Sequence, residues 1–311
     1  MTRDVHDALA SHATAFEVRR ELHRVPPHAT YEVALDGRRA VCKLATNDEG
    51  DPATEARVME HVARHAPIPV PRILAVGPDY FVAEWLEGVP EEPRVDEAWA
   101  RAAGAGMAKL HAATAGDCAA TGFPRGTAGE GLALDGHPSW TDTLRALLLD
   151  CRAFLAARGR DEGSAVAVEV VAFVDEHPEA FAGAGEPVLC HGNWVPDHVG
   201  VEDGEVVAAI DFEHALVAPG EYDYWRAALP AFEARGRPAL GRAFRAGYES
   251  VRPLPDGFAR RADLYRMINT VSYLKSLHLQ DRHGPAGTAR RAEWMTRYVR
   301  EALDGLRERY A

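Results

Sequence analysis

The stretch Val188-Leu-Cys-His-Gly-Asn-Trp-Val-Pro-Asp-His-Val199, with Ala208-Ala-Ile-Asp-Phe-Glu213 shortly after it, is the most decisive part of this chain. Its apolar runs predict short strands at Pro187–Cys190, Val199–Val201 and Val206–Ile210. The polar residues between them therefore form a loop, and Asp211 follows a hydrophobic strand. A carboxylate at a strand end beside a polar loop is well situated to hold a divalent metal ion.

The part of the chain before this stretch predicts a small antiparallel sheet with one inserted helix. A turn is expected at Arg24–Thr30, and Asp36-Gly37 is a strong hairpin signal. A helix is expected over residues 52–65, because Asp51 can act as its N-cap and Pro52 suits its first position. The expected strands are Phe16–Leu22, Tyr31–Leu35, Ala40–Ala45, Arg72–Val76 and Tyr80–Trp85.

A change in composition at Leu86–Asp96, which is rich in glycine, proline and acidic residues, indicates a hinge. Beyond it the periodicity is mainly helical, with a glycine-rich loop at Gly122–Gly136. Helices are expected at Glu97–Thr114, Trp140–Ala157, Val166–Glu176 and, as a run of several, from Glu221 to the C-terminus. The fold class is therefore α+β, with an N-terminal lobe at 1–86 and a larger helical lobe at 87–311.

Charge and hydropathy exclude several kinds of partner. The formal net charge of the 311 residues is −12, which argues against nucleic acid because phosphate neutralisation needs a basic face. No stretch has the uncharged length of a membrane span, and the first ten residues lack the pattern of a secretory signal. We expect no nucleic-acid or membrane partner and a cytoplasmic protein.

The decisive stretch resembles the aminoglycoside phosphotransferase family, whose members have a bilobal protein-kinase-like fold. That family carries His-Gly-Asp-x-x-x-x-Asn, then a short hairpin and Ile-Asp-x-x-x-Ala. The residues that match are His191, Gly192, Pro196, Ile210, Asp211 and Ala215, and Gly220-Glu-Tyr-Asp223 is similar to a signature slightly downstream. The resemblance covers roughly residues 16–235.

This resemblance implies roles for residues outside the decisive stretch. Lys43 occupies the strand position whose lysine holds the α- and β-phosphates of the nucleotide, and Glu55 the position of its acidic partner. Glu84, Trp85 and Leu86 resemble the hinge that offers backbone hydrogen bonds to adenine. Taken without the resemblance, Lys43 would be read as a solvated strand lysine and Glu55 as a surface helix residue.

The chain departs from the family at two positions of the loop. Asn193 stands where the family has its catalytic Asp, and His198 stands where it has a metal-binding Asn. An amide cannot accept a proton as a carboxylate does, but it can orient a hydroxyl group. We expect Asn193 to position the acceptor and His191 to brace the loop, with Asp197 as a substitute base.

The metal site is expected to be altered but retained. Asp211 is kept, and Glu213 offers a second carboxylate. Mg²⁺ prefers oxygen ligands whereas an imidazole suits softer ions, so His198 makes Mn²⁺ an alternative metal.

These features predict a phosphotransferase that moves the γ-phosphate of ATP or GTP to a hydroxyl of a small molecule. Acidic residues near the hinge favour a cationic acceptor; they are Glu87, Glu91, Glu92, Asp96 and Glu97. Two alternatives remain open. The altered loop also fits a pseudokinase or nucleotide-binding regulatory module without transfer activity, and the third interpretation is a nucleotide-independent scaffold.

Overall fold

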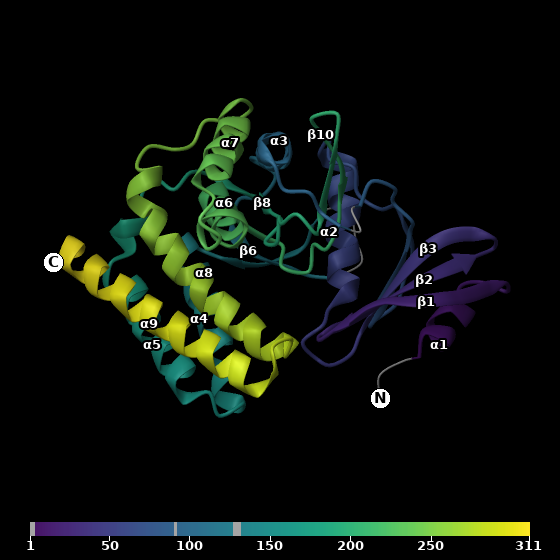
Figure 1. The fold of residues 1–311 in the computed structure, drawn as a ribbon, viewed down its shortest axis with the longest axis horizontal. Coiled ribbons are helices and arrows are strands. Elements are labelled where there is room, and N and C mark those ends of the chain that lie inside the picture. Colours follow the sequence, from purple (N-terminus) through teal and green to yellow (C-terminus); the bar gives the residue numbers. More distant parts are fainter. Residues whose placement is uncertain (1–3, 90–91, 127–131) are drawn as a thin grey trace.

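The N-terminal lobe is a five-stranded antiparallel sheet with one helix inserted after its third strand (Figure 1). The computed structural model describes residues 4–89, 92–126 and 132–311. The sheet has the order β1-β2-β3-β5-β4. Its elements are α1 Val5–Ala10, β1 Phe16–Val25, β2 His28–Leu35, β3 Arg38–Ala45, α2 Pro52–His65, β4 Ile73–Val76 and β5 Tyr80–Glu84. The fold class predicted from the sequence is confirmed.

Strand β3 lies in the middle of this sheet and carries Lys43. Lys43 is opposite Thr30 on β2 and opposite Phe81 on β5, so its backbone position is fixed from both sides. The Asp36-Gly37 hairpin is confirmed: both residues have positive φ, 47° and 77°, as a tight two-residue turn requires. The sheet thus places Lys43 at its centre, on the strand where a lysine was expected.

The predicted turn at Arg24–Thr30 is wrong in extent. The turn consists only of Pro26 and Pro27, which are joined by a cis peptide bond. Val25 pairs with His28 across the hairpin, and β2 also pairs with β3 along its whole length. Residues 28–30 therefore satisfy their backbone groups as a strand between two neighbours, which local sequence does not reveal.

The C-terminal lobe is mainly helical and contains two small sheets. The four-stranded sheet has the order β7-β6-β11-β8, and β9 and β10 form a separate hairpin. The helices of the C-terminal lobe are α3 Glu97–Thr114, α4 Trp140–Ala157, α5 Asp161–Glu176, α6 Gly220–Ala228, α7 Pro238–Glu249, α8 Phe258–Gln280 and α9 Gly284–Tyr310. A 3₁₀ turn lies at Pro178–Phe181 and a π turn at Leu229–Glu233. Its strands are β6 Thr121–Pro124, β7 Leu134–His137, β8 Pro187–Cys190, β9 Val199–Glu202, β10 Glu205–Ala209 and β11 Leu216–Pro219. None of the helices in the described ranges is both long and apolar enough to cross a membrane.

Three details of this lobe differ from the prediction. The ends of the expected loop Gly122–Gly136 are strands β6 and β7, which pair with each other; its middle, residues 127–131, lies outside the described part of the chain. Helix α5 begins at Asp161 rather than Val166. Strand β11 was not expected, because its strand form depends on pairing with β6 and β8, which lie far from it in the sequence.

Two tryptophans attach the decisive loop to α3. Trp194 is buried and its indole N–H donates to the carbonyl oxygen of Ala103 at 2.9 Å. The indole N–H of Trp99 donates to the carbonyl oxygen of Val199 at 3.0 Å. The loop between β8 and β9 is therefore held against α3 at its middle and at its β9 end, which positions the polar side chains described next.

Candidate active site

A single buried ammonium group joins the two lobes. Lys43 Nζ lies 2.7 Å from Glu55 Oε2 on α2 of the same lobe. It also lies 2.6 Å from Asp211 Oδ1 and 3.3 Å from Glu213 Oε2, both on the segment after β10. Lys43 thus contacts three carboxylates from two different parts of the chain. The structure brings together four of the residues predicted from the sequence.

The electrostatics of this cluster follow from one ammonium shared by three carboxylates. Burial opposes the charged form of Lys43, but Asp211, Glu55 and Glu213 outweigh it and raise its pKa well above the usual range. Burial raises the pKa of Glu55 to about 8, although it lies beside Lys43, because Asp211 and Glu213 share that ammonium. Burial also opposes ionisation of Asp211, but Lys43 and His198 hold its pKa well below the usual range. The excess of negative charge can accommodate a cation.

His191 braces the loop as a neutral imidazole. Its Nε2–H donates to the carbonyl oxygen of Ile210 at 3.0 Å, and its Nδ1 accepts from the backbone N–H of Asn193 at 3.1 Å. Burial lowers its pKa to about 4. The two hydrogen bonds need one donor and one acceptor, which is the neutral form. His191 therefore links the loop to the strand that precedes Asp211.

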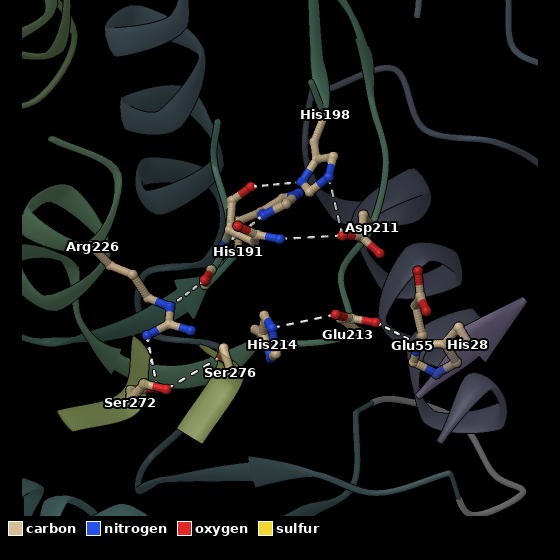
Figure 2. Close-up of polar contacts among 12 residues, drawn as sticks. His28, Glu55, His191, His198, Asp211, Glu213, His214, Arg226, Ser272 and Ser276 are labelled. Carbon is tan, nitrogen blue, oxygen red and sulfur yellow. Dashed lines mark hydrogen bonds and ion pairs between the residues drawn. The ribbon is translucent and has the colours of Figure 1, made fainter. Parts of the chain in front are cut away.

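His198 faces Asp211 (Figure 2), and the side chain of Asn193 contacts the same carboxylate. Asn193 Nδ2 donates to Asp211 Oδ2 at 3.2 Å, and His198 Nε2 lies 3.3 Å from the same oxygen. His198 Nδ1 lies 3.1 Å from the carbonyl oxygen of Asn193. Both ring nitrogens of His198 therefore lie near an oxygen atom, and a contact of one ring nitrogen with a backbone carbonyl commonly orients a metal-ligating histidine.

This geometry agrees with the comparison with known families. A family model described as the phosphotransferase enzyme family matches residues 27–264, which include the N-terminal sheet from β2 onward and the whole polar cluster. The chain belongs to this phosphotransferase family. It is accordingly a small-molecule kinase that uses a hydroxyl acceptor, and the prediction of the family from the sequence is confirmed.

Solved structures share the fold at low identity. A candidate fructosamine-3-kinase from Thermobifida fusca has 21% identity and a TM-score of 0.68 over 96% of this chain and 98% of its own. Aminoglycoside phosphotransferase APH(4)-Ia has 17% identity and a TM-score of 0.66 over 96% and 97%. A thermostable mutant of the same enzyme, in a ternary complex with ADP and hygromycin B, has 18% identity and a TM-score of 0.66 over 96% and 98%. A search of curated proteins found no match to this sequence.

Two groups of residues predicted from the sequence lie outside the carboxylate cluster around Lys43. They are Asp197 and the hinge residues 84–86. Asp197 is exposed, and among the described residues it forms no hydrogen bond or ion pair. Glu84 ends β5 with its carboxylate paired to Arg72, and the Trp85 ring stacks under the guanidinium of Arg39, 3.5 Å from Cζ to the ring centroid. The side chains of Glu84 and Trp85 are thus engaged on the sheet. The roles of these residues and Leu86 stay predictions.

Asp223 was not predicted as a site residue, although its side chain binds the start of the loop between β8 and β9. Its carboxylate accepts from the backbone N–H groups of His191 and Gly192, each at 2.8 Å. It also lies 3.1 Å from Nε2 of the buried His111. The similarity of Gly220-Glu-Tyr-Asp223 to a family signature was the only signal in the sequence. An acidic residue near a helix start gives no indication of its target.

His28 is a second residue that sequence reasoning missed. Its Nδ1 lies 2.6 Å from Glu213 Oε2, and its buried Nε2 has no hydrogen-bond partner among the described residues. One ligand atom each of His28, Glu55 and Glu213 lie within 4.8 Å of one another. Because residues 24–30 were expected to form a turn, nothing in the sequence predicted that an imidazole on β2 would lie next to Glu213.

A cavity of about 240 Å³ opens beside this cluster. It lies between the Pro26-Pro27 turn, the segment from Glu213 to Leu216, and helices α4, α6 and α8. Its polar lining comprises His28, Glu49, Asp51, Asp150, Glu213, His214, Arg226, Ser272, Lys275 and Ser276. The cavity is the space next to Glu213 in which an acceptor molecule could lie.

Proposed function

We propose that this phosphotransferase moves the γ-phosphate of ATP or GTP to a hydroxyl group, with an asparagine where a catalytic carboxylate is usual. The observation that supports it is the contact of Lys43 with both Glu55 and Asp211, at 2.7 and 2.6 Å. A lysine that holds the α- and β-phosphates, an acidic partner and a metal-binding Asp are the parts that kinases need in place. The complex of APH(4)-Ia with ADP and hygromycin B gives the proposal a precedent in the same fold.

The proposed roles follow the contacts. Lys43 holds the α- and β-phosphates, and Glu55 orients it. Asn193 positions the acceptor hydroxyl, because its side-chain carbonyl can accept a hydrogen bond while its amide donates to Asp211. The backbone of residues 84–86 binds the adenine or guanine base. Asp197 is kept as an alternative base.

A divalent metal fits the donor set of the described residues. Asp211 and Glu213 supply carboxylates, and His198 Nε2 lies 3.3 Å from Asp211 Oδ2. This mixed set suits Mn²⁺ as well as Mg²⁺. When bound, such a metal supplies positive charge that neutralises the phosphates during transfer.

The absence of a carboxylate at position 193 sets an expectation for the rate. General-base assistance is typically worth about 10²–10⁴ in rate. Phosphoryl transfer draws most of its acceleration from positioning and charge neutralisation, which Lys43 and a metal at Asp211 would provide. We therefore expect turnover that is slower than that of a carboxylate-containing relative.

The preference for a cationic acceptor remains a prediction. Glu92 lines a separate cavity of about 300 Å³ against β9, and Asp96 is the N-cap of α3, accepting from Trp99 N–H. Glu91 lies outside the described residues. The hinge acids that the structure describes are absent from the lining of the cavity beside Glu213.

The test of the proposed function needs no knowledge of the acceptor. We would measure the thermal unfolding midpoint with ATP, GTP and ADP, each with Mg²⁺ or Mn²⁺, for the wild type and Asp211→Ala. A metal-dependent nucleotide shift that is lost in Asp211→Ala is the expected result. Asp304→Ala is a matched control, because Asp304 lies on the surface of α9 with 76% of its side chain exposed. The absence of any shift in the wild type would contradict the proposal.

A pseudokinase is the second candidate, favoured by the presence of Asn193 beside Asp211. It predicts the same nucleotide shift but no transfer to any acceptor and no slow hydrolysis of ATP. Release of phosphate from γ-labelled ATP, measured over hours for the wild type and Asp211→Ala, separates the two. Release that depends on Asp211 supports the enzyme.

A further inference from the structure

Arg226 on α6 is a buried cation whose hydrogen-bond acceptors among the described residues are all neutral. Only 4% of its surface is exposed. Its Nε donates to the carbonyl oxygen of Gly192, and its Nη1 donates to Ser272 Oγ at 2.9 Å and to Asn269 Oδ1 at 3.4 Å. All of these acceptors are neutral, and no carboxylate of the described residues forms an ion pair with Arg226. Buried charges are normally paired, since an uncompensated ion inside a protein is strongly destabilising.

A second buried arginine in the same lobe shows the usual arrangement. Arg261 on α8 is 1% exposed and its Nε donates to Glu221 Oε2 at 2.8 Å, so its charge is matched. Asp223 lies one turn before Arg226 on α6, but its oxygens are occupied by His191, Gly192 and His111. The Tyr273 ring, whose centroid lies 4.9 Å from the Arg226 Cζ, provides partial cation–π compensation. Arg226 thus retains capacity for an anion.

The unmatched charge faces the cavity beside the active site. Arg226, Ser272 and Ser276 all line the cavity of about 240 Å³ that also contacts Glu213 and His214. Figure 2 shows Arg226 and the two serines on one side of His214, with Glu213 and His28 on the other. The hydroxyl groups of Ser272 and Ser276 are one helical turn apart on α8. Arg226 Nη1 donates to Ser272 Oγ, and Ser276 lines the same cavity. A guanidinium with hydroxyl groups in the same cavity is a donor set suited to carboxylate or phosphate oxygens.

Two other charges of the cavity, Lys275 and Glu213, are already paired, and Asp51 is the exposed N-cap of α2. Lys275 Nζ lies 2.7 Å from Asp150 Oδ2 and 3.2 Å from Glu49 Oε2. Glu213 is shared between Lys43 and His28. This leaves Arg226 as the buried charge of this lining with neutral partners only, which favours an anionic rather than a cationic occupant at its end of the cavity.

We propose that Arg226, Ser272 and Ser276 form an oxyanion subsite that holds a carboxylate or phosphate group next to the site of transfer. The source of that group rests on the proposed function. It is either an acidic substituent of the acceptor or the terminal phosphate of the nucleotide. In both cases the ligand chemistry is the same, an oxyanion that pairs with the Arg226 guanidinium.

The test supplies the missing anion from the chain itself. Ser272→Asp places a carboxylate where Ser272 Oγ now lies, 2.9 Å from Arg226 Nη1, and Ser272→Asn is its neutral control of equal size. We expect Ser272→Asp to have the higher unfolding midpoint of the two, since it pairs the buried charge. We also expect it to bind inorganic phosphate and gluconate at least tenfold more weakly than Ser272→Asn, measured by calorimetric titration. Ser276→Asp and Ser276→Asn repeat the comparison if Ser272→Asp does not fold.

Nucleotide titrations distinguish the two sources. If the acceptor supplies the oxyanion, gluconate binds the ATP complex as well as the free enzyme, and Ser272→Asp leaves ATP and ADP affinities unchanged. If the terminal phosphate occupies the subsite, Ser272→Asp weakens the binding of ATP but not of ADP. Inorganic phosphate then competes with ATP but not with ADP. The proposal is overturned if neither oxyanion binds the wild type, or if the Asp and Asn variants bind them equally. A nucleotide shift that persists in that case leaves the proposed function intact.

Discussion

Lys43 Nζ lies 2.6 Å from Asp211 Oδ1, although 168 positions separate the two residues in the sequence. The contact closes the N-terminal sheet onto the loop that follows β10. Because Glu55 and Glu213 also contact Lys43, at 2.7 and 3.3 Å, one ammonium stabilises a cluster of buried carboxylates.

The first prediction concerns removal of this ammonium. Lys43→Met leaves three carboxylates without their cation, and breaking a buried ion pair costs about 3–5 kcal/mol. We expect a loss of that size in the free energy of unfolding at pH 7, measured by urea denaturation, together with loss of the nucleotide shift. Lys109→Met is the control, since Lys109 pairs with Glu205 at the surface and such pairs contribute about 1 kcal/mol or less. Equal losses in the two variants would show that the Lys43 cluster does not stabilise the fold.

The second prediction concerns the amide of Asn193. Asn193→Asp replaces a donor 3.2 Å from Asp211 Oδ2 with a like charge, so we expect a lower unfolding midpoint in EDTA, by at least about 2 °C. Millimolar Mn²⁺ should narrow the difference in unfolding midpoint between Asn193→Asp and the wild type, because a cation relieves the repulsion between the two carboxylates at positions 193 and 211. Asn193→Ala removes the donor without adding charge, and its midpoint should respond less to Mn²⁺.

The activity of the same variant separates enzyme from pseudokinase. If the wild type turns over, Asn193→Asp is impaired or little changed, since the surrounding groups are arranged for an amide. Phosphate release by Asn193→Asp alone, with an inert wild type, would support the pseudokinase.

The third prediction concerns the backbone of the loop. Gly192 has φ of 76°, and an added Cβ would lie 2.0 Å from the carbonyl oxygen of His214. Gly204 has φ of 81° with no atom within 4 Å of such a Cβ. Gly204→Ala should therefore lose about 1–2 kcal/mol from strain alone, whereas Gly192→Ala should lose more than about 3 kcal/mol. Urea denaturation of both variants measures the difference, and similar values would mean that the loop moves without penalty.

The fourth prediction is a pH dependence of stability. Burial lowers the pKa of His191 from 6.5 to about 4, so the unfolded chain binds this proton more readily than the folded one. The stabilising effect is complete above about pH 6.5 and is lost as the pH falls toward 4, by about 3 kcal/mol. His191→Gln should be less stable at pH 7 but lose less between pH 6.5 and 4. Parallel curves for the two proteins would exclude His191 as a source of this dependence.

The sequence by itself determined the local elements and the family. Strong periodicity and capping residues fixed α2 after Asp51, and α3 and α4 at their observed ends. The Asp36-Gly37 dipeptide fixed the hairpin before β3, because only a few residue types tolerate positive φ at both positions. The motif residues between His191 and Ala215, taken together with Lys43 and Glu55, indicated the phosphotransferase family by resemblance. All of these signals act between residues that are near one another in the chain.

Only the tertiary structure decided which residues distant in the sequence form ion pairs and which charge is left without one. The pairing of His28 with Glu213 depends on β2 continuing through residues predicted as a turn, which its two neighbouring strands impose. The unmatched charge of Arg226 depends on helices α6 and α8 lying side by side, which places the neutral Asn269 and Ser272 of α8 next to it. Burial and ion pairing act through space between residues remote in sequence, so no local pattern encodes them.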